Sequence, residues 1–323
     1  MTASLEISGL NVTFPTPLGD LLAVRGVDVT VSSDDVVGVV GESGSGKSVT
    51  FLAAMGLLPS SAKVEGSIRI DGTEMIGAKA TKWRTVRGNK IAMIFQDPLS
   101  ALNPVMRVGS QIVEMLRAHQ TLSKSAAWTR SVELLELVGI PQPDQRARQY
   151  PHEFSGGMRQ RAIIAMAIAN NPRVLIADEP TTALDVTVQA QILDVIDRVR
   201  KEFGIAVVLI THDLGVVARM CARVQVMYAG LTVESGPIDD VFDSPTHPYT
   251  RGLLASLPRV GMDRLPPIGG FPPNMLAVPS GCAFHPRCQH VVEECKSAVP
   301  ELRAIGPMRS ACIRVEQIAK ARR

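Results

Sequence analysis

Eight residues near the start of the chain, Gly41 to Ser48, have types and a spacing suited to binding a phosphate group. They fit the pattern G-x-x-x-x-G-K-[ST] without a mismatch. The glycines let successive backbone N–H groups point inward at phosphate oxygens, and a helix starting near Lys47 adds its N-terminal dipole. We expect Lys47 to reach the β- and γ-phosphates of ATP and the Ser48 hydroxyl to ligate Mg²⁺. The residues assigned to ATP binding here are Gly41, Glu42, Ser43, Gly44, Ser45, Gly46, Lys47 and Ser48.

A second group of candidate residues ends an apolar segment. Residues Val174 to Ala177 are all apolar, and the carboxylates Asp178 and Glu179 follow directly. In phosphate-loop NTPases such a strand lies beside the loop, so Asp178 is placed to hold Mg²⁺ and Glu179 to polarise the attacking water. Alone, the pattern fits a strand followed by an ordinary acidic turn equally well. Together with the phosphate loop, it predicts a site that hydrolyses ATP.

Shortly before this strand, Phe154 to Arg161 read Phe-Ser-Gly-Gly-Met-Arg-Gln-Arg. This segment resembles the signature motif of ABC-type ATPases, usually L-S-G-G-Q, with Met158 in place of the last glutamine. In that family the motif begins a helix, and its serine and glycine amides donate to the γ-phosphate of ATP bound on the opposite subunit. Without the other motifs, Ser-Gly-Gly would be a common turn and helix cap. The resemblance assigns this role, in trans, to Ser155, Gly156, Gly157, Met158 and Gln160.

Further residues match the same family in order along the chain. Gln96 resembles the Q-loop glutamine, which senses Mg²⁺ and the transmembrane partner, and Asp185 resembles the D-loop aspartate. His212 resembles the switch histidine, which contacts the γ-phosphate and acts with Glu179 in catalysis. Phe14 matches the aromatic residue that stacks on adenine, although it fits a strand core position equally well. The usual Gly-Glu before the loop strand is Asp34-Asp35 here, away from the catalytic groups, so we expect an active ATPase.

Two later segments narrow the resemblance. Residues Ser244 to Thr250 and Gly281 to Cys288 look like the segments that follow the core of dipeptide and oligopeptide importer ATPases. The resemblance then covers nearly the whole chain and implies a subunit that powers peptide import. It also implies a second ABC ATPase subunit, commonly a paralogue, two transmembrane permease subunits and an extracytoplasmic substrate-binding protein. The expected location is peripheral, on the cytoplasmic face of the inner or plasma membrane.

Other functions stay open alongside peptide import. Similar ATPases serve importers of nickel chelates and some glycosides, and a non-transport ABC ATPase is a further alternative. The DNA-repair members carry long coiled-coil insertions between phosphate loop and signature, but this chain has no heptads there. A phosphate-loop kinase would lack the signature motif and the switch histidine.

Four of the five cysteines lie in the C-terminal region, with the spacing C-x5-C-x6-C-x16-C. Structural zinc sites usually begin with tight C-x2-4-C pairs, which this spacing lacks. Four thiolates at looser spacing suit a [4Fe–4S] cluster, and the resemblance to importer ATPases implies the same group. Zinc, or cysteines that are reduced or disulfide-linked, are the alternatives. The predicted ligands are Cys282, Cys288, Cys295 and Cys312.

The elements that must position these residues follow an α/β pattern. Strands are predicted at residues 5–12, 22–31, 36–40, 67–70, 91–95, 174–177, 206–210 and 224–228, and helices at 47–58, 108–120, 125–138, 156–169, 186–203 and 213–220. We therefore expect an ABC-type phosphate-loop ATPase core with an antiparallel β subdomain and an inserted helical subdomain at about residues 100–170. We expect this ATPase domain to cover residues 1–257. Dense prolines beyond that point predict an irregular C-terminal extension, residues 258–323, with few regular elements.

The composition supports a globular protein that does not bind nucleic acid. The chain has 323 residues, 46% of them hydrophobic, which is ample for a buried core. A net charge of +3 with no basic run, and 4% aromatic residues, argue against a nucleic-acid surface. We find no signal peptide and no apolar run long enough to span a bilayer. We therefore expect a soluble intracellular protein that reaches the membrane through its partners.

Overall fold

The computed structural model describes residues 3–97, 101–182, 184–257 and 268–320. The chain divides into two compact units, each built from several segments. The first contains residues 1–6, 30–36 and 69–209, and the second contains residues 7–29, 37–68 and 210–323. Each unit thus combines segments that are distant in the sequence.

The parallel strands of the first unit consist almost entirely of apolar residues, as expected for strands buried on both faces. Strands β6 (Ile91–Ile94) and β7 (Val174–Asp178) pair in parallel. Strand β8 (Ala206–Ile210) is the other neighbour of β7. This arrangement places the predicted residues Asp178 and Glu179 at the carboxyl end of the middle strand, the edge where ligands bind in open α/β sheets.

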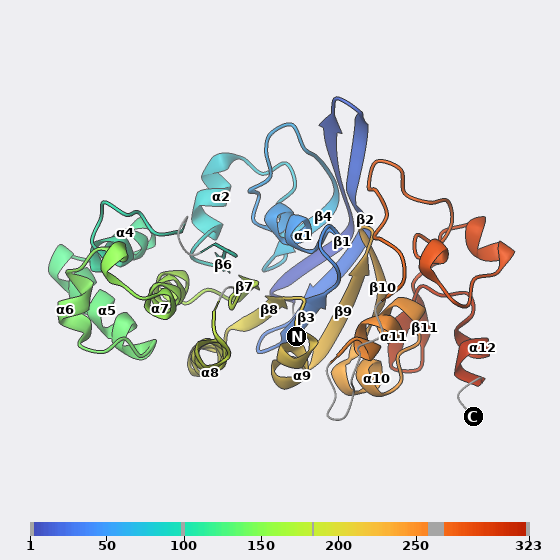
Figure 1. Cartoon of the computed structure of the whole chain (residues 1–323). Coiled ribbons are helices and arrows are strands. Elements are labelled where there is room, and N and C mark those ends of the chain that lie inside the picture. Colours follow the sequence, from blue (N-terminus) through green and yellow to red (C-terminus); the bar gives the residue numbers. More distant parts are fainter. Residues whose placement is uncertain (1–2, 98–100, 183, 258–267, 321–323) are drawn as a thin grey trace. The chain divides into compact units, whose positions relative to one another are not determined.

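Helices fill the stretch between β6 and β7. They are α4 (Val108–His119), α5 (Lys124–Leu137), α6 (Pro143–Ala147) and α7 (Gly156–Ile168). These four helices, drawn in green in Figure 1, pack against one another. The short helix α2 (Ala80–Val86), strand β5 (Thr73–Glu74) and the 3₁₀ turn Pro151–Glu153 complete the first unit, together with α8 (Val186–Phe203).

The main sheet of the second unit mixes parallel and antiparallel pairs. Strand β3 (Val36–Val40) runs parallel to β9 (Arg223–Tyr228), which pairs antiparallel with β10 (Leu231–Pro237). Strand β12 (Met308–Ser310) pairs with β10, and β11 (Arg303–Ile305) pairs with β12. The order is therefore β3-β9-β10-β12-β11.

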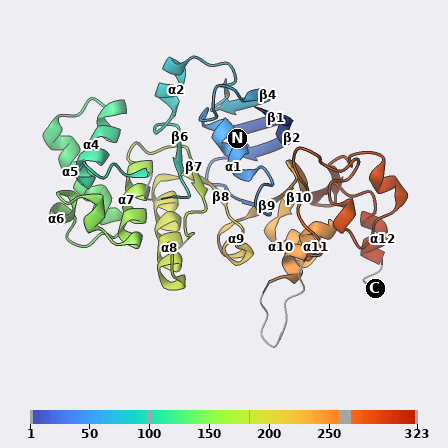
Figure 2. The same ribbon diagram turned by 45° about the horizontal axis from the view of Figure 1, so that its top comes forward.

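A separate sheet contains the N-terminal strands. Strands β1 (Leu5–Thr16), β2 (Gly19–Val31) and β4 (Lys63–Ile70) lie side by side in the order β2-β1-β4, as Figure 2 shows. At its end, β4 pairs antiparallel with β5. Strand β2 alternates between buried and exposed residues over much of its length, which is the pattern of a sheet with one covered face.

Helix α1 (Lys47–Ala54) begins at the predicted residue but ends earlier than predicted. The expected end was residue 58, before Pro59. The structure instead places Gly56 at φ +60°, and the backbone N–H groups of Gly56 and Leu57 donate to Ala53 and Leu52. A glycine in the left-handed region is a common helix stop, so it ends the helix before proline is reached.

The described part of the C-terminal extension contains a few short regular elements. Besides β11 and β12 it contains helix α12 (Val315–Lys320) and short 3₁₀ turns at His285–Arg287 and Glu293–Lys296. The prediction of few regular elements thus agrees with the structure, but the strand β12 was not foreseen, because it pairs with the edge of β10 and local composition does not reveal that pairing. The predicted domain boundary, between residues 257 and 258, adjoins residues 258–267, which lie outside the described part of the chain.

A buried carboxylate fixes the segment that leads into the extension. The side chain of Glu234, on β10, is fully buried and accepts hydrogen bonds from the backbone N–H groups of Thr246 and His247. Burial raises the pKa of this carboxyl. These bonds hold the start of helix α11 (Pro248–Ala255), whose Tyr249 is fully buried. Helices α9 (Leu214–Met220) and α10 (Ile238–Asp243) also belong to the second unit.

Helix α8 provides a test of how the core is held. Its buried residues Ile192, Val195, Ile196 and Val199 follow helical spacing, and Ile196 is fully buried. We expect Ile196→Ala to lower the free energy of unfolding by about 2–5 kcal/mol, because it removes buried methyl groups and leaves a cavity. Arg198→Ala, an exposed position on the same helix, should change it by no more than about 0.5 kcal/mol. Urea denaturation of both variants measures the difference, and equal losses would contradict the assignment of the buried face.

Candidate functional site

The phosphate loop connects β3 to α1, as the sequence predicts. All five residues of β3 are buried, and the loop follows at its carboxyl end. Gly46 has φ +96°, and a Cβ atom there would lie 2.7 Å from the Ala23 carbonyl oxygen, so only glycine fits. The Lys47 Nζ is buried and donates to the carbonyl oxygens of Gly41 at 2.7 Å and Glu42 at 2.9 Å. The ammonium group therefore lies within the turn of the loop, where phosphates bound by the loop amides would meet it.

In the first unit, the structure brings Gln96 and Glu179 together. The Glu179 carboxylate accepts a hydrogen bond from Gln96 Nε2 at 2.9 Å and another, from Thr182 Oγ1, at 2.8 Å. Glu179 also has φ +46°, a left-handed conformation that is uncommon for a non-glycine residue and clusters at functional sites. Its neighbour Asp178 is the buried last residue of β7. The carboxylate of Glu179 is thus held in one orientation by two donors from different segments.

The Ser-Gly-Gly turn forms the start of α7, also as predicted. Ser155 is the N-cap, and its Oγ accepts from the Met158 backbone N–H at 3.3 Å. At Gly157 a Cβ atom would lie 2.9 Å from Val188 Cγ1, so a small residue lets α7 approach α8 closely. Gln160 is 1% exposed, and its Oε1 has no hydrogen-bond partner within the described residues. Gly156 and Gly157 are the first residues of the helix, and the backbone amides at a helix N-terminus suit an anion.

The remaining predicted residues have simpler surroundings. Asp185 caps α8, accepting from the Val188 N–H at 2.9 Å, which is the ordinary role of an acidic helix cap. His212 is exposed and lies between β8 and α9, in the second unit. Phe14 is half-buried in β1. Residue 183, within the predicted D-loop segment, lies outside the described residues. The roles of Asp185, His212 and Phe14 stay predictions.

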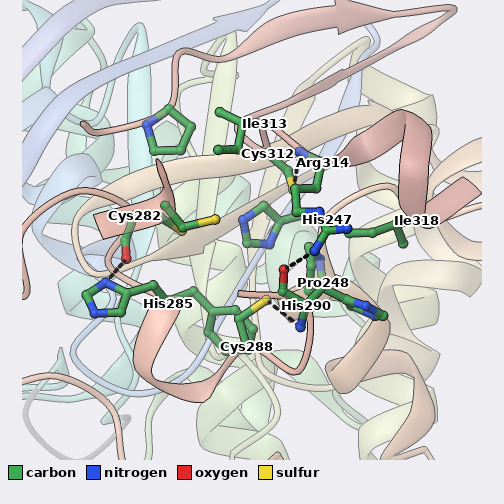
Figure 3. A pocket seen from close by; sticks show the side chains of 13 residues that line it. His247, Pro248, Cys282, His285, Cys288, His290, Cys312, Ile313, Arg314 and Ile318 are labelled. Carbon is green, nitrogen blue, oxygen red and sulfur yellow. Dashed lines mark hydrogen bonds between the residues drawn. The ribbon is translucent and has the colours of Figure 1, made fainter. Parts of the chain in front are cut away.

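All four C-terminal cysteines line one cavity, shown in Figure 3. The Cys288 Sγ accepts from the His290 backbone N–H and the Cys312 Sγ from the Arg314 N–H, each at 3.4 Å, while the Cys282 N–H donates to the Cys295 carbonyl at 2.8 Å. Burial raises the pKa of Cys282 to about 11, and the neighbouring cysteines add to this effect. Burial also raises the pKa values of Cys288 and Cys312.

These cysteines are free thiols, so the structure contains no disulfide among them. Across the described part of the chain, no group of three or more His, Cys, Asp or Glu side chains is arranged to hold a metal ion. The predicted [4Fe–4S] site is therefore not confirmed, although its four candidate ligands do share a cavity.

The structure also shows contacts on the phosphate loop that the sequence analysis missed. The Glu42 carboxylate accepts from both terminal nitrogens of Arg287, and the Glu42 backbone N–H donates to Tyr249 Oη at 2.8 Å. Both partners come from segments singled out for their resemblance, Ser244 to Thr250 and Gly281 to Cys288. In the sequence, Arg287 stands out only as the neighbour of the candidate ligand Cys288, and this position does not indicate that Arg287 binds Glu42.

Comparison with known proteins decides the family. The ABC transporter family matches residues 24–182, and the oligopeptide/dipeptide transporter C-terminal region matches residues 233–295. An oligopeptide transport ATP-binding protein of Salmonella typhimurium, OppD, is 49% identical over 97% of this chain and 95% of its own length. The protein of the same name from Escherichia coli is 49% identical over 92% of this chain and 89% of its length. This chain belongs to the ABC transporter ATPases.

Solved structures support the same fold for this ABC ATPase. The ATP-binding cassette MJ0796, in a dimer bound to ADP and phosphate, matches with a TM-score of 0.65, 25% identity and 72% coverage of this chain. The protein cbiO1 of Clostridium perfringens, part of an ABC transporter complex, matches with a TM-score of 0.64 and 27% identity over 76% of this chain. The predicted fold class is therefore confirmed, as is ATP hydrolysis as the activity. Among the described residues, no helix of the ATPase is long and apolar enough to cross a membrane.

The contact between Thr182 and Glu179 yields a prediction about turnover. We expect Thr182→Val to lower kcat for ATP hydrolysis about tenfold, because it removes one hydrogen bond that orients the charged carboxylate. The affinity for ATP should stay within about twofold of the parent, since Thr182 lies outside the phosphate loop. Steady-state phosphate release measures both. Thr85→Val, which removes a similar hydroxyl contact on α2, is the control, and an unchanged kcat for Thr182→Val would show that Thr182 does not orient Glu179.

Proposed function

We propose that this ABC ATPase powers the import of di- or oligopeptides through a membrane transporter. The observation that carries the proposal is the similarity over nearly the whole chain to oligopeptide transport ATP-binding proteins. A Brucella melitensis relative described as a putative peptide import ATP-binding protein is likewise 49% identical over 98% of this chain. The match to the oligopeptide/dipeptide transporter C-terminal region adds support outside the ATPase core, whose motifs all ABC ATPases share.

The proposed assembly contains four further proteins. One is a second ABC ATPase, because a composite site takes its phosphate loop from one subunit and its Ser-Gly-Gly turn from the other. The family resemblance favours a paralogue over a second copy of this chain. Two permease subunits form the membrane path, and an extracytoplasmic protein delivers the peptide. The ATPase then lies on the cytoplasmic face of the membrane, with the Gln96 region toward the permease. No nucleic acid takes part.

The proposed division of work in hydrolysis follows from the site residues. Loop amides and Lys47 bind the β- and γ-phosphates, and Ser48, Gln96 and Asp178 are the residues that would hold Mg²⁺, which when bound neutralises phosphate charge. Glu179 orients the water whose oxygen attacks the γ-phosphorus as the bond to the bridging oxygen breaks, and accepts the proton of that water. His212 contacts the γ-phosphate. The fixed carboxylate of Glu179, bonded to Gln96 and Thr182, fits this role.

The proposed function is tested with the ATPase, its paralogue and the permease subunits reconstituted in liposomes. We expect ATP hydrolysis to rise when a peptide-loaded binding protein is added, and labelled peptide to accumulate. Glu179→Gln should abolish both while preserving ATP-dependent association of the ATPase subunits, because it removes the proton acceptor but leaves the phosphate loop intact. Glu202→Gln, at an exposed position on α8, is the matched control. Stimulation by a nickel chelate but not by peptide would overturn the substrate assignment.

We also propose that Cys282, Cys288, Cys295 and Cys312 hold a [4Fe–4S] cluster that stabilises the C-terminal extension, taken as residues 258–323 beyond an ATPase domain of residues 1–257. The chemistry of the donors fits, since four free thiols line one cavity. Backbone N–H groups already donate to two of the sulfurs, as they do around such clusters. Metal binding would also keep as thiolates the groups whose pKa values burial raises.

Chemical analysis of the protein purified without oxygen decides the nature of this group. We expect iron and acid-labile sulfide in equal amounts, with loss of both in Cys295→Ser because one ligand is removed. Cys221→Ser, a buried thiol in helix-flanking sequence far from the tail in the chain, should retain them. Zinc without sulfide, or no metal, would overturn the cluster.

A further inference from the structure

Each polar group of Glu42, the second residue of the phosphate loop, is held by a different partner. Its carbonyl oxygen accepts from Lys47 Nζ, within the loop. Its backbone N–H donates to Tyr249 Oη, and its carboxylate accepts from Arg287 Nη1 at 2.6 Å and Nη2 at 2.9 Å. Two of these three partners therefore come from the C-terminal part of the chain, more than 200 residues away.

Arg287 is itself firmly placed. Its side chain is 4% exposed, and its Nε donates to the Gly269 carbonyl oxygen at 2.8 Å. The guanidinium lies 5.8 Å from the ring centres of both Tyr228 and Phe284, within the range of cation–π attraction. These contacts fix the planar fork that meets the carboxylate, and a bidentate arginine pair of this kind is stronger and more directional than a single contact.

The charge of Glu42 explains why its ion pair with Arg287 matters for nucleotide binding. A carboxylate in the phosphate loop would repel the phosphates of ATP if it were not compensated. Arg287 supplies the opposite charge at hydrogen-bond distance, through both of its terminal nitrogens. Only 25% of the Glu42 side chain is exposed, so water screens the charge less than at an open surface.

We propose that Arg287 is a positioning residue of the ATP site: from the C-terminal extension it fixes Glu42 and cancels its charge, so that the phosphate loop binds ATP. Tyr249 assists by holding the backbone of the same residue. The proposal rests on ATP hydrolysis, which the family establishes, and not on which solute is imported or on what the cysteines bind.

The decisive variants are Arg287→Met and its combination with Glu42→Gln, made in the full chain. For Arg287→Met we expect the Kd for a fluorescent ATP analogue to rise about tenfold while kcat at saturating ATP falls less than about twofold, because the catalytic groups are untouched. Adding Glu42→Gln should restore the Kd to within about threefold of the parent, since it removes the uncompensated charge. Arg309→Met, in the same extension, is the control.

Two results would overturn the proposal. One is an unchanged Kd for Arg287→Met. The other is a double variant that binds no better than Arg287→Met, which would show that Arg287 serves only the folding of the extension. If Arg287→Met does not give folded protein by circular dichroism, Arg287→Lys replaces it in the same cycle with Glu42→Gln. A lysine cannot reproduce the bidentate fork, so its loss of affinity should be non-additive with Glu42→Gln, and additive effects would count against the proposal.

Discussion

A phosphate loop must keep its backbone N–H groups directed inward, at a space that a highly charged anion will enter. The N–H groups that the loop leaves for the ligand cannot also hold its shape, so other contacts must do so. Its shape therefore depends on what surrounds it: the buried strand β3 before it, helix α1 after it, and contacts on its remaining polar groups. In this ATPase Lys47, within the loop, and Tyr249 and Arg287, outside it, supply those contacts.

Sequence patterns over a few residues predicted the features that depend on local backbone geometry. The loop needs glycine where φ is positive and backbone approaches closely, so Gly46 could be read from the spacing alone. Strands buried on both faces are recognisable as apolar runs, and β3 and β8 match their predicted residues. The predicted end of α1 was wrong because two residues that stop helices lie close together, and Gly56 ends the helix before Pro59 is reached. The hydrogen bond from Gln96 to Glu179 could not be foreseen, since it depends on how the segments after β6 and β7 meet.

The other features that the sequence did not predict are pairings between residues far apart in the chain. The tail looked irregular because it is rich in proline, yet a strand needs only a partner edge, and β10 offers one to β12. The pair of Glu42 and Arg287 joins residues 245 positions apart. No periodicity in the sequence relates such residues. Glu42 also occupies a position of the loop motif at which any residue is allowed, so the motif gives it no specific role. Charged pairs of this kind depend on the tertiary fold, which places the extension beside the phosphate loop.

These contacts change how the C-terminal extension should be regarded. An extension that served only to contact other proteins would need no partly buried ion pair with the phosphate loop. Here the residue next to Cys288 is Arg287, so the loop that bears a thiol of the cysteine cavity also bears the guanidinium that holds Glu42. Phe284, in the same turn, packs edge-on against Tyr228 of β9, with ring centres 5.3 Å apart. Because interiors are close-packed, a change in that turn cannot be absorbed without moving one of its neighbours. The cysteine-bearing turn and the phosphate loop are therefore parts of one packed structure within the second unit.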